Sequence, residues 1–573
     1  MSDNKTLLYL LRRDLRVADN PILHALSKNK QGFTHVIPVY AFQPHQIEVS
    51  GFATNGNSPF EEARSAVGSF WRCGSHRAKF LAESVWDVKT GLEKLGSGLT
   101  IRVGPHGDIA KSIIEAEELN VKGLWMTEEE GSEEKQEERA VRQVCKDAGV
   151  DFRLWVDEKY LVDDRDLGKK LEDPQALPDV FTSYRKMMEP LKEVSRDVLP
   201  DIKRLPPVPK SVPEQPWNFT IPDTLQAVIE ALHKPLKSIP YIDTPLPYPN
   251  GAKSAHPFIG GEITGLERLD HLLSSGAMSA YKDTRNGMLG MDFSSKLSAW
   301  LALGCITARQ VNTALNEFED GSNSKWSTGE GFGKGENQGT TAMRFELLWR
   351  DYMRLCTRKY GDKLFQPQGF RQADAEWVRT ESPESQEKIQ RIINGTTGMG
   401  MIDASQRELY HTGYTSNRAR QNVASFLAKH LRLDWRIGAE YYEMMLVDYD
   451  VSSNWGNWQY VAGIGNDPRG EARVFNPVKQ SFDYDANGEY VKMWVSEVRK
   501  LEEPAEIFQA WTVPESERKG KGLSGTPEQE AMWRNPLKRI EFTVGRRAQR
   551  RRGNGRGGAN RGRGNDGGRG GRG

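Results

Sequence analysis

The segment TLLYLLRRDLR, residues 6–16, begins with an apolar run of strand length and ends in charged residues. Four further apolar runs of similar length follow at residues 35–42, 99–103, 123–126 and 152–156. Helical patterns lie between several of them, at residues 80–95, 109–118 and 133–148. This alternation predicts an α/β domain over residues 1–156, with a doubly wound parallel sheet covered by helices on both faces.

These strands lack the usual nucleotide-binding motifs. Arg12-Arg13-Asp14 follows the first run where a GxGxxG loop would stand, and residues 329–335 do not complete a P-loop. Parallel sheets nevertheless bind ligands at the carboxyl ends of their strands. The alternation therefore predicts a fold and leaves its ligand open.

The rest of the chain changes character twice. Residues 157–254 are rich in proline, which predicts a connector running over the surface, with one helix at 224–233. Residues 255–510 repeat apolar residues at helical spacing and predict an all-helical domain, interrupted at 321–339 by a Gly/Ser-rich loop that we expect to be mobile. Beyond about residue 523 we expect no core, so residues 511–573 are predicted to be an extension with a disordered Arg/Gly-rich tail.

Charge is distributed unevenly over the 573 residues. The formal net charge is +1, but residues 545–573 hold ten Arg and one Asp, which leaves −8 for the first 544 residues. Because Arg pairs with phosphates and stacks on bases, the tail predicts contact with nucleic acid, DNA or RNA. The alternative is a tail that only improves solubility. The four cysteines are scattered and form no CxxC pair, so we expect reduced thiols and no zinc site.

Targeting signals are the next consideration. The apolar run at 7–11 is too short for the core of a signal peptide, and no apolar segment has transmembrane length. A Ser/Arg-rich leader is also missing before the first strand. We therefore expect a monomer in the nucleus and/or cytoplasm, without a membrane partner, and we do not expect organelle targeting.

Residues 446–460, LVDYDVSSNWGNWQY, concentrate groups that suit ligand chemistry. Asp448, Asp450 and Asn454 can orient a polar heterocycle, while Trp458 and the other indole can pack against it or exchange electrons with it. The alternative is a loop beside a Trp-rich core.

Three other segments place polar groups at or near helices. Residues 294–298, SSKLS, precede a helix, where hydroxyls, Lys296 and unpaired N–H groups favour an anion, although a serine cap alone also explains them. Residues 346–350, ELLWR, put an acid, an indole and an Arg on one helix face, which suits a planar ligand or a salt-bridged surface. Residues 417–421, NRARQ, begin a helix with two Arg that need anionic partners.

These segments resemble the photolyase/cryptochrome family over about residues 5–500. The similar motifs are RRDLRVADNP, SSKLSAWLALG, ELLWRDYMR, NRARQNVASFL and DYDVSSNWGNWQYVAGIGNDPR, in this order. Gln421 and the form WQYVAGIGNDPR, with Tyr460, resemble the cryptochrome DASH branch. The resemblance implies an α/β domain for an antenna pigment and a helical domain that holds FAD in a folded shape.

The resemblance also implies roles for individual residues. Cofactor contacts would come from Tyr281, Ser294, Ser295, Lys296, Leu297, Ser298, Arg350, Asn417, Arg420, Asp448, Asp450 and Asn454. Arg420 and Asp448 would pair beside the flavin, Asp450 would contact the isoalloxazine edge, and Asn454 would face its N5 and support the reduced, anionic flavin. Trp458, Trp435 and Trp377 fall where the family has its electron-transfer triad. Ordinary core packing is the alternative for these three tryptophans.

The same resemblance implies a substrate pocket. Glu346 and Trp349 correspond to the pocket for a cyclobutane pyrimidine dimer, where an acid can donate to the dimer carbonyl and an indole packs on the flipped lesion. Asn454 joins them as a catalytic candidate. Gln421 and Tyr460 replace a Met and a Trp of classical repair enzymes, so the pocket should hold an extruded dimer less firmly.

These residues lead to one functional expectation and two alternatives. We expect FAD-dependent, blue-light-driven repair of dimers, mainly in single-stranded DNA. Blue-light signalling is one alternative, and a nucleic-acid-binding photoprotein without catalysis is the other. The antenna of this branch resembles 5,10-methenyltetrahydrofolate, and Glu83 is a candidate contact.

Overall fold

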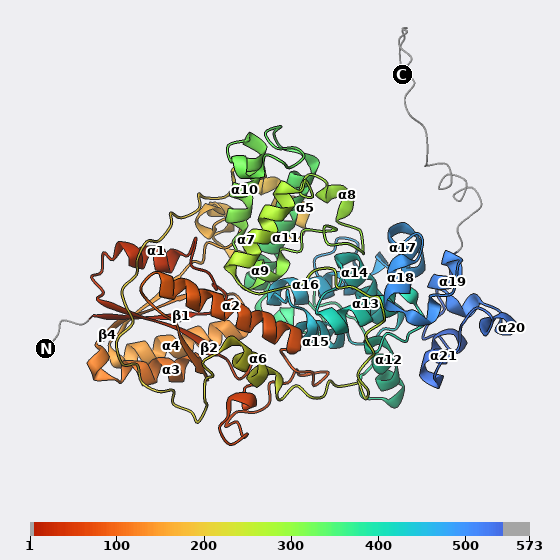
Figure 1. The fold of residues 1–573 in the computed structure, drawn as a ribbon, viewed down its shortest axis with the longest axis horizontal. Coiled ribbons are helices and arrows are strands. Elements are labelled where there is room, and N and C mark those ends of the chain that lie inside the picture. The colour runs from red at the N-terminus through yellow and green to blue at the C-terminus, as the bar shows by residue number, and fades with distance from the viewer. Residues whose placement is uncertain (1–4, 543–573) are drawn as a thin grey trace, which may run out of the picture.

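The computed structural model describes residues 5–542 and places a parallel sheet at one end and helices at the other (Figure 1). The strands are β1 (Thr6–Leu11), β2 (His35–Phe42), β3 (Thr100–Val103), β4 (Val121–Thr127) and β5 (Asp151–Trp155). Their order is β3-β2-β1-β4-β5, and every neighbouring pair is parallel. The predicted doubly wound sheet is confirmed.

Strand β1 shows why these apolar runs form a sheet buried on both faces. All six of its residues are buried. Leu7, Tyr9 and Leu11 join the core that includes residues of α1 (Pro21–Lys28) and α2 (Ser75–Lys94). Leu8 and Leu10 face the opposite side, towards α3 (His106–Ile114) and α4 (Ser132–Ala148). Alternate residues of one strand therefore serve two cores, as a central parallel strand requires.

The proline-rich connector is more deeply built into the molecule than the sequence predicts. Helix α6 (Leu225–His233) lies where a helix is predicted and packs on α2. Helix α5 (Phe181–Met188) was not predicted, and it packs on α11 (Gln338–Tyr360). Tyr184 and Leu161 are buried. The expectation of a surface-running connector is wrong for these residues, because the apolar face of the short helix α5 and single side chains such as Leu161 turn inward.

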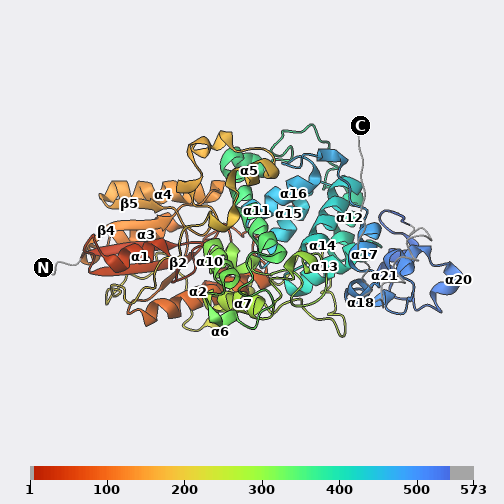
Figure 2. The ribbon, with the colours of Figure 1, turned by 90° about the horizontal axis from the view of Figure 1, so that it is seen from above.

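The remaining helices make up the rest of the molecule, and among them α11 and α16 contact each other (Figure 2). They are α7 (Glu262–Ser274), α8 (Tyr281–Thr284), α9 (Ser298–Ala302), α10 (Ala308–Asp320), α12 (Pro383–Ile393), α13 (Gly400–Thr412), α14 (Asn417–Ser425), α15 (Trp435–Met445), α16 (Val451–Ala462), α17 (Pro477–Tyr484), α18 (Glu489–Trp494), α19 (Pro504–Phe508), α20 (Glu515–Arg518) and α21 (Pro527–Arg534). The all-helical character expected for this part of the chain is confirmed.

The Gly/Ser-rich segment at 321–339 contacts α7 at Trp326 and Gly329, and its mobility stays a prediction. Trp326 is buried, and its indole N–H donates to Asp270 on α7 at 3.1 Å. A Cβ at Gly329 would lie 2.0 Å from the carbonyl oxygen of Leu273. Glycine therefore serves close backbone approach to α7 here.

The segment after residue 510 also packs against the helices. Leu523, Met532 and Trp533 are buried, and the Leu537 N–H donates to the carbonyl of Thr397 at 2.9 Å. The expectation of no core beyond about 523 is wrong, because these few side chains enter an existing core instead of forming their own. The predicted Arg/Gly-rich tail lies outside the described residues.

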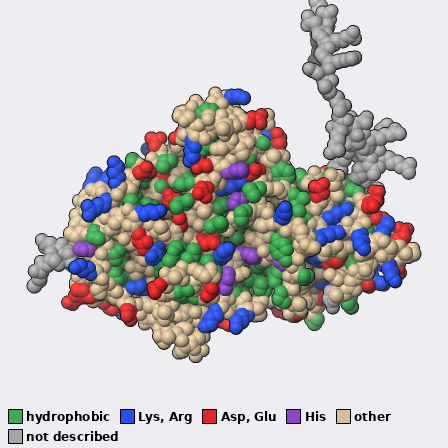
Figure 3. Space-filling view, in the orientation of Figure 1, with side chains coloured by type: hydrophobic (Ala, Val, Ile, Leu, Met, Phe, Trp, Pro, Cys, Tyr) green, Lys and Arg blue, Asp and Glu red, His purple; other side chains and the backbone are tan. Residues whose placement is uncertain are grey.

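The outer surface and helix lengths bear on possible partners. On the face shown in Figure 3, acidic and basic side chains are interspersed. Within residues 5–542, no helix combines the length and apolar content needed to cross a membrane.

Candidate functional site

A cavity of about 490 Å³ lies among the helices. This volume is within the range of small-molecule sites. Its walls bring together most predicted site residues, from segments far apart in the chain. These are Tyr281, Ser294, Ser295, Lys296, Ser298, Glu346, Trp349, Arg350, Asn417, Arg420, Gln421, Asp448, Asp450, Asn454, Trp458 and Tyr460. Leu297 is fully buried and is not on the wall, and Trp435 and Trp377 also lie outside it.

Asp450 sets the start of the helix that carries the aromatic wall. It is the N-cap of α16, and its carboxylate accepts the Ser453 N–H at 2.8 Å. Burial opposes ionisation of Asp450, but Arg350, Arg13 and the Ser453 hydrogen bonds together hold its pKa below the usual range. One turn later, the Asn454 amide donates to the carbonyl of Ala439 at 3.0 Å, which fixes this side chain against α15.

Asp448 joins two other walls of the cavity. Its Oδ2 accepts hydrogen bonds from Ser298 Oγ at 2.7 Å and from Arg420 Nη2 at 3.0 Å. Its Oδ1 is buried without a hydrogen-bond partner, and so is Nε of Arg350. Buried polar atoms are nearly always satisfied, so an acceptor and a donor left open here suit a ligand rich in polar groups. FAD, with ribityl hydroxyls, phosphates and a polar ring edge, is such a ligand.

The loop before α9 is held by Lys296. The ammonium of Lys296 donates to the carbonyls of Gly290 at 3.0 Å, Met291 at 2.9 Å and Phe293. Burial and the nearby Arg268 lower the pKa of Lys296 to about 8. Its three donors are therefore engaged by backbone, which corrects the interpretation of Lys296 as a free cation for an anion. Its role in this structure is to hold the loop that presents Ser294 and Ser295.

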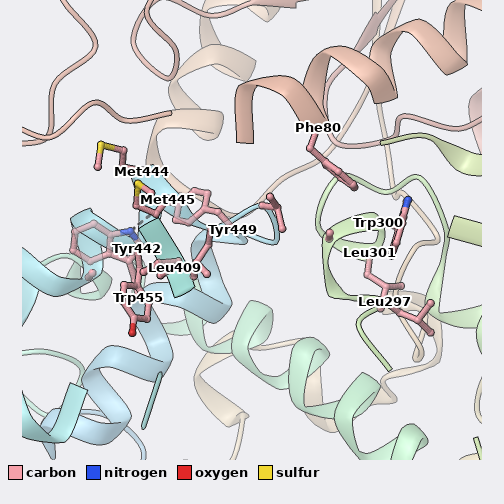
Figure 4. Close-up of a cluster of buried hydrophobic side chains, with 14 of the residues drawn as sticks. Phe80, Leu297, Trp300, Leu301, Leu409, Tyr442, Met444, Met445, Tyr449 and Trp455 are labelled. Atoms are coloured by element: carbon pink, nitrogen blue, oxygen red, sulfur yellow. Dashed lines mark hydrogen bonds between the residues drawn. The ribbon is translucent and has the colours of Figure 1, made fainter. Parts of the chain in front are cut away.

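Helix α9 is in turn anchored on the α/β domain. Trp300 is buried and packs edge-on against Phe80 of α2, with ring centroids 5.8 Å apart (Figure 4). Leu297, the N-cap of this short helix, and Leu301 on it are also buried. The predicted contact Leu297 therefore supports the cavity from behind its wall.

Glu346 and Trp349 stand at one side of the cavity with partners that the sequence did not predict. Glu346 forms an ion pair with Arg285. Burial raises the pKa of Glu346, while Arg285 opposes that shift. Trp349 stacks on Phe181 of the connector, with ring centroids 3.7 Å apart and an interplanar angle of 14°. Neither partner belongs to a motif, because 61 and 168 residues of chain separate them from Glu346 and Trp349.

The two substitutions singled out in the sequence complete this side. Tyr460 meets Trp349 edge-on, with ring centroids 5.9 Å apart. Gln421 accepts a hydrogen bond from Arg418 at 3.0 Å, and Arg418 also donates to Asn286 at 2.9 Å. We call this side of the cavity, formed by Glu346, Trp349, Gln421 and Tyr460, the mouth. It combines an acid in an ion pair, an aromatic face and an amide held by a hydrogen bond.

The predicted tryptophan triad runs from the cavity to a partly exposed position. Trp458 lines the cavity and lies over Gly438, where a Cβ would be 2.1 Å from the indole. Trp435 lies one helical turn before Gly438 on α15. The indole N–H groups of Trp435 and Trp377 donate to the same carbonyl, that of Pro367, at 3.2 and 3.0 Å. This shared acceptor brings the second and third indoles together.

An antenna pigment could bind at Glu83 or at the carboxyl edge of the sheet, and the side chains at both positions already contact other parts of the protein. Glu83 accepts the Gly260 N–H at 2.8 Å and thereby ties α2 to the chain before α7. At the carboxyl edge of the sheet, Arg12 pairs with Glu138 at 2.8 Å and Arg13 with Glu134 at 2.9 Å. Because these side chains already have partners within the protein, the residues that would contact the antenna pigment stay a prediction.

Comparison with known proteins agrees with this arrangement. Residues 7–209 match the family model described as DNA photolyase, and residues 343–533 match the FAD binding domain of DNA photolyase. A putative cryptochrome DASH, mitochondrial, of Neurospora crassa is 52% identical, covering 95% of this chain and 76% of its own length. The chain belongs to the cryptochrome DASH branch of the photolyase/cryptochrome family.

Other members of the family extend the comparison. Cryptochrome DASH of Xenopus laevis is 36% identical over 87% of this chain and 84% of its own length. The crystal structure of a Synechocystis cryptochrome superposes with a TM-score of 0.75 at 34% identity, over 92% of this chain and 96% of that one. The helical domain is thus an FAD-binding domain, and the open polar atoms of Asp448 and Arg350 fit that cofactor.

The expectation about the compartment is wrong. The Neurospora relative is named mitochondrial, and a cryptochrome DASH of Ostreococcus tauri, 35% identical over 86% of this chain, is named chloroplastic/mitochondrial.

Proposed function

We propose that this protein uses FAD and blue light to repair cyclobutane pyrimidine dimers, preferentially in single-stranded DNA. The observation that supports the proposal is that two sets of residues, one suited to the cofactor and one to the substrate, line the same cavity. Asp448, Asp450 and Arg420 suit the cofactor, and Glu346 and Trp349 suit a flipped dimer. Reduced FAD, when excited by light, supplies the electron that splits the dimer.

The residues of the mouth divide the binding of the dimer between them. The stacked pair Trp349 and Phe181 offers a fixed apolar face, so little side-chain freedom is lost when a pyrimidine of the flipped dimer packs on it. Glu346 and Arg285 lie where they can meet the dimer carbonyls. Donors placed where negative charge develops stabilise the transition state most in a site shielded from water. Burial raises the pKa of Glu346, while the paired Arg285 opposes that shift and has further N–H groups that can donate to the dimer.

The preference for single strands rests on Gln421 and Tyr460. Both line the cavity, and both carry a polar group where classical enzymes have a Met and a Trp. Flipping a dimer out of a duplex costs a few kcal/mol. Weaker apolar contacts offset less of that cost, whereas a single strand avoids most of it.

We also propose 5,10-methenyltetrahydrofolate as a second chromophore in the α/β domain, contact between the Arg/Gly-rich tail and single-stranded DNA or RNA, and action as a monomer. The names of the mitochondrial and chloroplastic relatives support action in an organelle. An absorption band in addition to that of flavin in the purified protein would test the folate.

A single-stranded oligonucleotide with one dimer tests the proposed repair. With reduced flavin we expect dimers to disappear under blue light and to persist in the dark, and Glu346→Gln to slow their loss while keeping FAD. If the dimers persist under blue light as well as in the dark with the unmodified protein, the result would favour the alternative function, blue-light signalling.

A further inference from the structure

Glu408 on α13 is a buried acid that the proposed repair does not use. Only 2% of its surface is exposed, and its carboxylate accepts a hydrogen bond from the Tyr490 hydroxyl at 2.7 Å. Among the described residues it has no ion-pair partner within 4.0 Å. Burial raises the pKa of Glu408 to about 7, against which Tyr490 and Thr415 act. A buried carboxyl without a counter-charge is costly, and such groups often serve function.

A row of buried hydroxyls leads away from Glu408. The hydroxyl oxygens of Tyr490 and Thr415 lie 3.5 Å apart, and those of Thr415 and Ser405 lie 3.0 Å apart. These three side chains are fully buried. Because a hydroxyl can donate one hydrogen bond and accept another, the row can be oriented in one direction, towards Glu408.

The far end of this row meets Tyr442. The hydroxyl of Tyr442 is buried and has no hydrogen-bond partner. Burial raises the pKa of this phenol, and the side chain of Ser405 lies close enough to oppose that shift. A small movement of the Ser405 or Tyr442 side chain would therefore join the phenol to the row. The Tyr442 phenol, which has no hydrogen-bond partner, and the Glu408 carboxylate, which has no ion-pair partner among the described residues, are thus the two ends of one path.

Tyr442 also touches the electron-transfer residue at the cavity. Its ring meets Trp458 edge-on, with centroids 5.2 Å apart and an interplanar angle of 81°, and both residues line the cavity. A phenol loses an electron readily only when its proton leaves at the same time. Tyr442 combines contact with Trp458 with a path for that proton.

We propose that Tyr442 is a redox-active residue and that Glu408 accepts its proton through Ser405, Thr415 and Tyr490. The inference rests on the predicted role of Trp458 as an electron donor to bound FAD, which in its oxidised form and under light would accept one electron from Trp458. Tyr442 then gives one electron to the Trp458 radical cation and restores neutral Trp458. Its phenolic O–H breaks, each hydroxyl of the row passes a proton on, and a new O–H forms on Glu408. The products are a neutral Tyr442 radical and a protonated Glu408.

The charges near Glu408 set the pH at which this path works. Lys296 from the loop before α9 and Arg420 from α14 lower the pKa of Glu408, while burial raises it. Asp485, before α18, accepts the Tyr490 N–H at 2.9 Å. Glu408 can accept a proton only as a carboxylate. The path is therefore open above the pKa of Glu408 and closed below it.

Two measurements test the proposal. In the cofactor-free protein, infrared spectroscopy should show a carboxylic-acid band that titrates with a midpoint near pH 7 and is missing in Glu408→Gln. In the FAD-loaded protein with ring-deuterated tyrosine, electron paramagnetic resonance after blue flashes should show a tyrosyl radical whose yield rises through the same pH. Removing a general base costs on the order of a hundredfold, so Glu408→Gln should nearly abolish this radical at pH 8.

Tyr441→Phe is the matched control. Tyr441 also has a buried hydroxyl without a partner, but its ring packs on Phe70 instead of Trp458. Tyr442→Phe should remove the tyrosyl signal and leave a tryptophan radical, whereas Tyr441→Phe should keep the tyrosyl signal. An unchanged signal in Tyr442→Phe, or a yield independent of pH, overturns the inference. Failure of the unmodified, FAD-loaded protein to form any radical would instead contradict the proposed photochemistry.

Discussion

Replacing Asp448 by Asn removes the negative charge of this side chain and keeps its shape. In the structure Asp448 Oδ2 pairs with Arg420 at 3.0 Å, and its Oδ1 is buried with no partner in the protein. A hydrogen bond to a charged group is worth roughly 1.5–3 kcal/mol, so loss of the charge should weaken FAD binding by about 2 kcal/mol. That corresponds to a rise in Kd of roughly thirtyfold. The Arg420 guanidinium would also lose its counter-charge, which lowers the free energy of unfolding.

Titration of the cofactor-free protein with FAD, followed by flavin fluorescence, measures this effect. The matched control is Glu497→Gln, which neutralises another buried pair, Arg407 with Glu497 at 2.8 Å, whose residues do not line the cavity. We expect Glu497→Gln to reduce stability without changing the Kd for FAD. Equal Kd values for Asp448→Asn and the unmodified protein would refute the assignment of Asp448 to the cofactor. A parallel loss of FAD in Glu497→Gln would show that the effect is general destabilisation.

Three further outcomes follow from the same contacts. Trp458→Phe keeps an aromatic ring but is harder to oxidise, so photoreduction of the flavin should nearly stop while FAD content stays normal, and unchanged photoreduction would exclude Trp458 as the required donor. Glu346→Gln should slow repair by roughly tenfold to a hundredfold, with normal FAD binding and photoreduction; equal loss of all three would indicate a structural role. Deleting residues 545–573 should flatten the log–log salt dependence of single-strand binding by about 3.5, if about five Arg contact phosphates, whereas an unchanged slope would leave the tail without a role in binding.

The parts of the fold that could be predicted are those whose pattern repeats along the chain. The five apolar runs predicted the strands because each run is continuous and short, and β2 agrees with the predicted bounds. Helix α5 could not be predicted, because it is short and lies among prolines. Its burial depends on α11, which is more than 150 residues away in the chain.

The site shows the same division between local and long-range information. Motifs predicted which residues meet at the cavity, since Asp448, Asp450 and Asn454 are close in sequence and share a helix start. They could not predict the partners of those residues. Arg285 pairs with Glu346 and Phe181 stacks on Trp349 only after the chain has folded. Lys296 was assigned the wrong partner because its carbonyl acceptors are backbone atoms, which every sequence contains.

The central claim is tested most directly by comparing repair of one dimer in a single strand with repair in a matched duplex. Both rates are measured side by side under blue light with reduced flavin. Each tenfold preference requires only about 1.4 kcal/mol, which is less than the cost of extruding a dimer from a duplex. We predict that the single strand is repaired at least about tenfold faster, that neither substrate changes in the dark, and that Gln421→Met with Tyr460→Trp narrows the difference. Persistence of the dimer in the illuminated single strand would contradict the account.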